Sequence, residues 1–162
     1  MNKKQALPWD NPRFRNWIAV GRACQVMQLT LSRMLQPLEL KPPHLDILAN
    51  VYRHAEISQQ DLARRLLVGR SNLSMLLPQL EKRGLVIRQT DPNDRRVLRL
   101  SLTQEGRDLT EKALWIQSDL IERSMSVSSP EECDLVGDVM MRMIAELTTG
   151  AGPNHNGGDD DT

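Results

Sequence analysis

The chain of 162 residues is poor in aromatic side chains, with one Phe, one Tyr and three Trp. Its core must therefore be built from aliphatic residues, with methionine filling gaps. No apolar run approaches the roughly 18 residues of a transmembrane helix, and the N-terminus lacks the apolar stretch of a secretory signal. Two cysteines, Cys24 and Cys133, do not make a disulfide framework in a chain of this length. We therefore expect a cytoplasmic protein that contacts no membrane.

The signatures of an enzyme are missing as well. The sequence has no glycine-rich loop that could cradle a phosphate. Its histidines and cysteines show neither metal-ligand spacing nor the pairing of a nucleophile with a base. We expect no catalytic residue, no metal site and no cofactor.

Net charge is zero, which by itself argues against a nucleic-acid partner, but the charges are unevenly distributed. Residues 58–103 hold nine Lys or Arg and four Asp or Glu, an excess of five positive charges that the rest of the chain balances. A chance charge run on a solvated surface is one explanation. A basic binding face on an acidic body is the other, and it is the one we favour.

Residues 57–106 carry the most informative pattern, ISQQDLARRLLVGRSNLSMLLPQLEKRGLVIRQTDPNDRRVLRLSLTQEG. Ser58 followed by Asp61 predicts the start of a helix over residues 59–67. Gly69 and Arg70 predict a turn, and Ser71 is a natural N-cap for a helix over residues 72–83. This order is typical of a helix-turn-helix unit, whose second helix enters the DNA major groove.

A basic hairpin follows the second helix. Gly84 is a natural helix terminator, and alternating apolar residues predict strands over residues 85–89 and 97–102. The sequence Asp91-Pro92-Asn93-Asp94 between them has turn chemistry, and residues 56–58 are long enough only for a short strand. Arginines on such a hairpin could reach the minor groove beside the recognition helix.

Helices are predicted on both sides of this unit. Apolar residues at helical spacing predict one long helix over residues 13–36 and a second that begins at Pro43. Thr103 should cap a helix over residues 104–123, and Ser129-Pro130-Glu131-Glu132 should start a last helix that runs to about residue 147. The apolar stripes of these helices exceed what the core of a lone winged helix needs. They either pack within one chain or form a dimer interface, and we favour the dimer.

The predicted fold is therefore mainly α-helical with a small β-wing, a winged helix-turn-helix flanked by dimerisation helices. We expect a flexible N-terminus over residues 1–12, and an N-terminal dimerisation helix with a linker over residues 13–42. The DNA-binding domain should span residues 43–103, and the C-terminal dimerisation helices residues 104–148. Residues 149–162 are rich in Gly and Asp and should form a disordered acidic tail.

At this point the sequence resembles a known family. The segments VGRSNLSMLLPQLEKRGLV and DPNDRRVLRLSLTQEG are similar to the winged helix-turn-helix regulators of the MarR family, and they occur in the family's order. The resemblance covers residues from about 13 to 148 and is strongest between 57 and 106. It implies a homodimeric, sequence-specific transcriptional regulator, usually a repressor, that acts on a pseudo-palindromic site. It also implies that a small molecule or an oxidant controls DNA affinity.

The recognition helix should read base edges with residues near its N-terminus. Arg70 could contact a guanine or a phosphate, and Asn72 an adenine. Ser71 is either a contact or only a cap. Met75 departs from the family, where many relatives have a longer polar residue, and it could make only apolar contacts such as one to a thymine methyl. The base-reading candidates are Arg70, Ser71, Asn72, Ser74 and Met75.

A proline inside the recognition helix is the second departure from the family. Pro78 removes a backbone hydrogen bond and crowds the preceding turn, so we expect a bend there. The bend is either tolerated without consequence or sets the angle at which residues Ser71–Met75 enter the groove.

The wing should supply the remaining DNA contacts. One of Arg95 and Arg96 is expected to enter the minor groove, while the other pairs with Asp91 or Asp94 and stiffens the hairpin. In the family, the Asp of this motif often holds an Arg, which supports a structural role for Asp94. The candidates for wing and backbone contacts are Arg88, Arg95, Arg96, Gln59, Gln60 and Arg64, although a solvated face is an equal alternative for the last three.

The resemblance also suggests where an effector would bind. In this family, ligands commonly lie between the first two helices and the dimer helices, and an arginine with aromatic residues would suit an aromatic carboxylate. The candidates are Trp17, Arg22, His44, Tyr52 and Trp115, each of which could instead be an ordinary core or surface residue.

Two alternatives to a ligand-controlled repressor remain. Some family members sense oxidants through a first-helix cysteine that a second, C-terminal cysteine resolves, and Cys24 and Cys133 have that layout. However, Cys24 lies about two turns beyond the sensing position, and the only tyrosine is Tyr52. The other alternative is a winged helix that binds proteins and not DNA.

Overall fold

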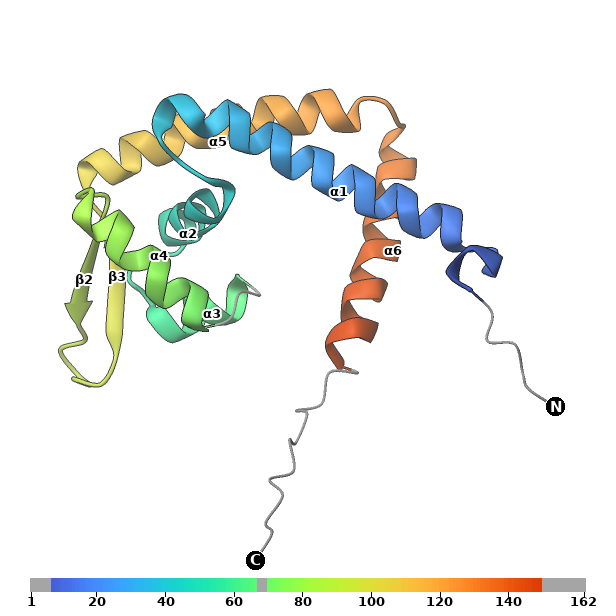
Figure 1. The fold of residues 1–162 in the computed structure, drawn as a ribbon. Coiled ribbons are helices and arrows are strands. Elements are labelled where there is room, and N and C mark those ends of the chain that lie inside the picture. The colour runs from blue at the N-terminus through green and yellow to red at the C-terminus, as the bar shows by residue number, and fades with distance from the viewer. Residues whose placement is uncertain (1–6, 67–69, 150–162) are drawn as a thin grey trace, which may run out of the picture. The chain divides into compact units, whose positions relative to one another are not determined.

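The computed structural model describes residues 7–66 and 70–149, without the side chains of residues 70–72. They form two compact units, one that ends at Leu120 and one that begins at Ile121. The elements, shown in Figure 1, are two 3₁₀ helices η1 (Pro8–Asp10) and η2 (Gln36–Leu38), helices α1 (Phe14–Leu35), α2 (Pro42–Arg53), α3 (Gln59–Arg65), α4 (Arg70–Lys82), α5 (Gln104–Met125) and α6 (Pro130–Thr149), and strands β1 (Ile57–Ser58), β2 (Val86–Thr90) and β3 (Leu98–Leu102).

A winged helix-turn-helix lies at the centre of the first unit, as the sequence predicted. Its core is aliphatic, and leucines on α2, α3, α4 and β3 are fully buried together, namely Leu45, Leu48, Leu62, Leu73, Leu77, Leu80 and Leu100. The helix-turn-helix therefore depends on leucine packing, without the aromatic residues that many cores of this size contain.

The sheet has the strand order β1-β3-β2, with both pairings antiparallel. Ile57 lies opposite Leu100, and Arg88 lies opposite Leu100 from the other side. The hairpin of β2 and β3 projects beyond the helices, so its connecting turn forms the tip of the wing (Figure 1).

Local capping signals in the sequence are confirmed. Ser58 Oγ accepts a hydrogen bond from the Asp61 amide at 3.0 Å at the start of α3. Thr103 Oγ1 accepts from the Gly106 amide at 2.9 Å at the start of α5. Ser129 and Glu132 form a reciprocal capping box, with distances of 3.3 and 2.9 Å. Gly84 has φ +68°, the left-handed conformation expected after α4.

Two predicted helix boundaries are wrong. The recognition helix α4 begins at Arg70, so Arg70 is not a turn residue, and Ser71 lies in the first helical turn and not at the N-cap. Helix α3 ends at Arg65, and residues 67–69 lie outside the described residues. A seven-residue helix has little propensity of its own, so its end is set by packing around Leu62.

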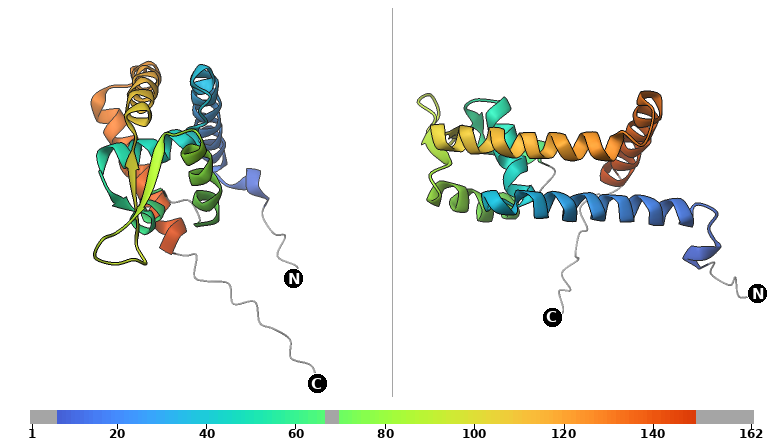
Figure 2. Two further views of the ribbon diagram at one scale, coloured as in Figure 1. Left: turned by 90° about the vertical axis from the view of Figure 1, so that its left-hand side faces the viewer. Right: turned by 90° about the horizontal axis from the view of Figure 1, so that it is seen from above.

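The first unit extends beyond the predicted DNA-binding segment. The C-terminal part of α1 contributes Leu31 and Leu35 to the core, and α5 contributes Ala113. Figure 2 shows that only this end of α1 lies against the winged helix, while the rest runs beyond it. The proposed boundaries at residues 42 and 103 thus fall inside one compact unit, because flanking helices complete its core. Of the predicted terminal segments, residues 8–10 form η1, Thr149 ends α6, and residues 1–6 and 150–162 are outside the described part.

Much apolar surface on the helices is exposed within each unit. On α1 it includes Val26 and Leu29, which are 61% and 50% exposed. On α6, Leu135, Val136, Met141 and Leu147 are exposed, and the helix has no buried residue. No helix in the described ranges is long and apolar enough to cross a bilayer.

Candidate nucleic-acid interface

The exposed face of α4 is the first part of the candidate interface. Leu73, Leu77 and Leu80 point into the core, which leaves Ser74 and Met75 exposed on the opposite side of the helix. Met75 is 65% exposed although it is apolar. Arg70 and Asn72 are in the first turn of the same helix, and the positions of their side chains are outside the described part of the chain. Pro78 is exposed and lies inside the helix.

A buried carboxylate organises the wing. Asp91 is 6% exposed, and its Oδ1 accepts hydrogen bonds from the amides of Asn93 at 2.7 Å and Asp94 at 3.3 Å. Its Oδ2 accepts from Arg99 Nε, while Arg99 Nη1 donates to the carbonyl of Glu56 at 3.0 Å. The Asn93 amide, followed by Arg99, holds the pKa of Asp91 below its ordinary value. Asp91 thus ties the tip turn to β3 and to the residue before β1.

The wing-tip arginines are in different environments. Arg96 pairs with Asp94 through Nε at 3.1 Å and Nη2 at 3.2 Å, and this hydrogen bonding lowers the pKa of Asp94. Arg95 is exposed and forms no ion pair within the described ranges. Arg96 is therefore the arginine of the two that pairs with an aspartate of the turn, and Arg95 is the candidate that is left for the minor groove.

Arg88, which we predicted as a DNA contact, forms a bidentate ion pair with Glu81 of the recognition helix. Its Nε and Nη2 donate to Glu81 at 2.9 and 2.7 Å. About a third of the Arg88 side chain and a quarter of Glu81 are exposed. The pair joins β2 to α4, so it connects the wing to the reading helix.

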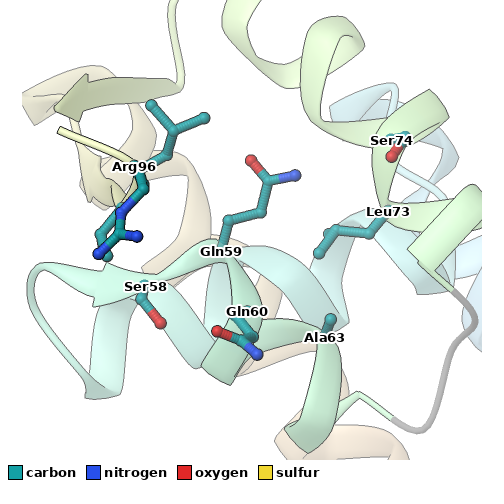
Figure 3. A pocket seen from close by; sticks show the side chains of 9 residues that line it. Ser58, Gln59, Gln60, Ala63, Leu73, Ser74 and Arg96 are labelled. Carbon is teal, nitrogen blue, oxygen red and sulfur yellow. The ribbon is translucent and has the colours of Figure 1, made fainter. Parts of the chain in front are cut away.

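A groove of about 440 Å³ lies between α3, the start of α4 and the wing. Figure 3 shows the Gln59 side chain between Arg96 on the wing side and Leu73 and Ser74 on α4. Gln59 Oε1 is buried and has no hydrogen-bond partner among the described residues. Gln60 also lines the groove, whereas Arg64 forms an exposed ion pair with Asp61 at 3.2 Å.

The effector candidates are in several different environments. Trp17, Arg22 and Trp115 are exposed, and Trp17 lines a small hollow with Phe14 and Arg13. His44 is buried and bonded to Gln79. The Tyr52 hydroxyl donates to Glu111 at 2.8 Å, which raises the pKa of Tyr52.

Arg107 lies over the Tyr52 ring, 5.2 Å from its centroid. Tyr52 therefore joins α2 to α5, and its hydroxyl already has a partner.

The two cysteines lie in different environments. Cys24 is an exposed free thiol on α1, and Cys133 is a half-buried free thiol near the start of α6. Cys133 Sγ lies 3.6 Å from the Met125 carbonyl. Within the described residues, no group of three or more His, Cys, Asp or Glu could hold a metal ion.

Sequence reasoning missed two residues that orient α4. Glu81 pairs with Arg88, as described above. Arg83 donates to the carbonyls of Glu39 at 2.7 Å and Leu38 at 3.1 Å, so it joins the end of α4 to η2. Glu81 and Arg88 carry opposite charges and lie seven residues apart, on either side of the end of α4. This spacing is the one sequence feature from which their ion pair could have been predicted. Nothing in the sequence marked the Arg83 contacts, which join residues more than forty positions apart.

Comparisons with known proteins agree with this geometry. Residues 38–97 match the model of the MarR family. The chain is 32% identical over 99 residues to the uncharacterized HTH-type transcriptional regulator YdgJ of Bacillus subtilis, covering 61% of this chain and 60% of that protein. It is 31% identical over 102 residues to the HTH-type transcriptional repressor MdtR of B. subtilis, covering 61% of this chain and 66% of MdtR.

A solved structure shares the fold. The S. aureus MepR–DNA complex matches with a TM-score of 0.75 and 23% identity, covering 80% of this chain and 96% of MepR. The sequence matches span less than two thirds of both curated relatives. The segment of residues 38–97 is therefore similar to the winged helix-turn-helix of MarR family transcriptional regulators, and the described part of the chain shares the fold of MepR.

Proposed function

We propose that this chain binds double-stranded DNA in a sequence-specific manner as a homodimer and represses transcription at the bound site. One observation carries the proposal: the exposed Ser74–Met75 face of α4 lies on the same compact unit as a stiffened wing with an available Arg95. A helix of this kind fits the major groove, and an arginine at a wing tip suits the negative potential of a narrow minor groove.

The dimer rests on the exposed apolar helices. Val26 and Leu29 on α1, and Leu135 and Leu147 on α6, are at least half exposed in a single chain. Apolar surface of this extent usually marks an interface, and a second copy would cover the same residues on both chains. Two-fold symmetry would then place two reading helices about 34 Å apart on a pseudo-palindromic site.

Repression and effector control are the finer parts of the proposal. The B. subtilis relative MdtR is a transcriptional repressor by name, which supports repression as the role of this chain. A small, aromatic ligand that releases DNA is favoured over oxidant sensing, because Cys24 lies about two turns beyond the family's sensing position and the chain has a single tyrosine. The oxidant-sensing alternative rests on the exposed Cys24. The protein-interaction alternative predicts no DNA affinity.

The proposal is tested by selecting duplexes from a randomised pool with the purified chain. The selected duplex and a scrambled one are then titrated by fluorescence anisotropy at about 150 mM salt. We expect the selected duplex to bind about a thousandfold more tightly, and light scattering to give the mass of a dimer. Equal weak binding to both duplexes would contradict sequence-specific recognition, and no enrichment would favour the protein-interaction alternative.

Arg95→Ala should weaken binding to every duplex, because the available wing-tip arginine contacts the minor groove and its phosphates. The slope of log affinity against log salt should fall by about one phosphate contact, roughly 0.9. Arg95→Lys is the matched control, since it keeps the charge and should keep the slope. If the affinity of Arg95→Ala at physiological salt equals that of wild type, the wing tip is not a contact.

Arg88 should act through Glu81 and not through DNA. Arg88→Gln and Glu81→Gln should each loosen the wing, and the double variant should lose no more stability than either single one. We expect a coupling free energy of about 0.5–1 kcal/mol in urea denaturation, since the pair is partly exposed. The salt slope of DNA binding should not change in Arg88→Gln. A slope reduced by about one contact would show that Arg88 leaves Glu81 to bind a phosphate.

A further inference from the structure

His44 is a buried polar residue that the candidate interface does not use. It lies in the first turn of α2 and is 6% exposed. Its Nδ1 is 3.3 Å from the amide nitrogen of Lys41, and its Nε2 is 3.1 Å from Gln79 Oε1 on α4. Gln79 Nε2 in turn lies 3.2 Å from the carbonyl oxygen of Met75. These contacts form a continuous chain from the start of α2 to the recognition helix.

The Lys41 amide and the Met75 carbonyl, at the two ends of this series of hydrogen bonds, fix the direction of every hydrogen bond in it. The Lys41 amide can only donate, so His44 Nδ1 must accept and therefore carries no proton. The imidazole proton is then on Nε2, which donates to Gln79 Oε1. The Met75 carbonyl can only accept, so the Gln79 amide nitrogen donates to it. Only the neutral Nε2–H tautomer of His44 satisfies all three contacts.

The chain reaches α4 at the turn that carries the exposed reading face. Leu77 and Leu80 hold the helix against the core by apolar packing, which is non-directional. The directional contacts of Glu81 and Arg83 lie at the C-terminal end of α4, beyond this turn. Pro78, next to Gln79, cannot donate a backbone hydrogen bond, so this turn is less rigid than an uninterrupted helix. A directional contact from α2 therefore has most influence here.

We propose that His44, as the neutral Nε2–H tautomer, is a positioning residue that orients α4 through Gln79 and so sets the sequence selectivity of DNA binding. The inference rests on the proposed DNA-binding function, which it deepens. His44 itself contacts no DNA in this proposal. Its effect reaches the bases through the Met75 turn.

Acidification should break the hydrogen-bond series between α2 and α4 at His44. Protonated His44 donates from both ring nitrogens, so its Nδ1–H would face the Lys41 amide. The charged groups that act on the ring are Lys41, just before α2, and Arg83 on α4, and both are cations. Burial lowers the pKa of His44, opposed by the bond to Gln79 and reinforced by both cations. The neutral form is thus favoured on folding, and its stabilisation is complete above about pH 6.5 and declines as pH falls from there toward the lowered pKa.

The first test requires no DNA. Nitrogen-15 spectra of the full chain at pH 7.5 should show His44 as the Nε2–H tautomer, with the shift of an unprotonated Nδ1. Gln79→Met should leave this tautomer in place, because the Lys41 amide still directs it. The Nδ1–H tautomer in wild type would overturn the proposal whether or not the protein binds DNA.

The second test measures selectivity, as the affinity ratio of the selected to the scrambled duplex at pH 7.5. Gln79→Met removes the link, and His44→Asn keeps an acceptor for the Lys41 amide but is too short to reach Gln79. Each should lower the ratio about five- to tenfold, the equivalent of one hydrogen bond, while binding to the scrambled duplex is unchanged. The double variant should lose no more than either single one.

The pH profile separates positioning from simple support of the fold. The selectivity of wild type should be constant above about pH 6.5 and decline as pH falls through the lowered pKa of His44, whereas that of His44→Asn should stay flat over the same range. Unchanged selectivity in Gln79→Met, equal losses for both duplexes, or the same decline in His44→Asn would overturn the proposal. Failure of wild type to select any duplex would contradict the proposed function instead.

Discussion

Gly106→Ala should strongly destabilise the protein, although it adds a single carbon atom. A Cβ at position 106 would lie 2.0 Å from the carbonyl oxygen of Leu85, 2.8 Å from its carbonyl carbon and 3.1 Å from its Cα. All three atoms are backbone, so no side-chain rotation relieves the clash. Helix α5 would have to move away from the start of β2.

The surrounding hydrogen bonds resist that movement. Thr103 donates its amide to Leu85 O at 3.1 Å and its hydroxyl to Gly84 O at 2.6 Å. The Thr110 hydroxyl is buried and donates to Gly106 O at 2.6 Å. Because the junction is held on both sides, we expect Gly106→Ala to lower the free energy of unfolding by about 3 kcal/mol or more, as measured in urea.

Gly21→Ala is the matched control. Gly21 lies inside α1, and a Cβ there would meet nothing within 4 Å. Alanine should therefore stabilise the helix by about 0.5–1 kcal/mol, since glycine is the poorer helix former. The account of the α5 junction would be wrong if Gly106→Ala unfolded at the same urea concentration as wild type.

The second large effect is expected at the wing. Asp91→Ala removes the acceptor for the amides of Asn93 and Asp94 and for Arg99 Nε. The tip turn should then lose its fixed conformation in the free protein, although the leucine core is untouched. Binding to DNA would then have to order about two residues of the turn, and the lost conformational entropy should reduce affinity about a hundredfold. Anisotropy titration measures that loss, and amide hydrogen exchange should show increased exchange confined to residues 90–98.

Asp94→Ala is the control for this effect, because it removes the Arg96 pairing and leaves the Asp91 contacts in place. Its loss of affinity should be clearly smaller. The lowered pKa of Asp91 also gives a sign for acid sensitivity: the stabilisation is present above the ordinary aspartate pKa and is lost as pH falls through the lowered one. Wild-type affinity in Asp91→Ala would show that the wing does not need this carboxylate.

Local chemistry explains why most elements could be predicted. Ser58, Thr103 and Ser129 each accept a hydrogen bond from an amide three residues away, so their effect does not depend on the rest of the fold. The αL conformation at Gly84 is another choice made within one turn. The cap predicted at Ser71 was wrong because a cap-forming residue is also tolerated inside a helix, and α4 begins at Arg70.

Some features of the candidate site could likewise be predicted from local sequence, and others depend on the tertiary structure. The sequence by itself determined the helix-turn-helix order, the turn chemistry of the wing and the residues on the exposed face of α4, because these follow from periodicity and short-range hydrogen bonds. Only the tertiary structure decided which partner each polar side chain takes. Arg88 pairs with Glu81, Arg96 with Asp94, and His44 with Gln79. The last pair joins residues 35 positions apart, and an interaction effective over a few ångströms can be assigned only after the core has brought its partners together.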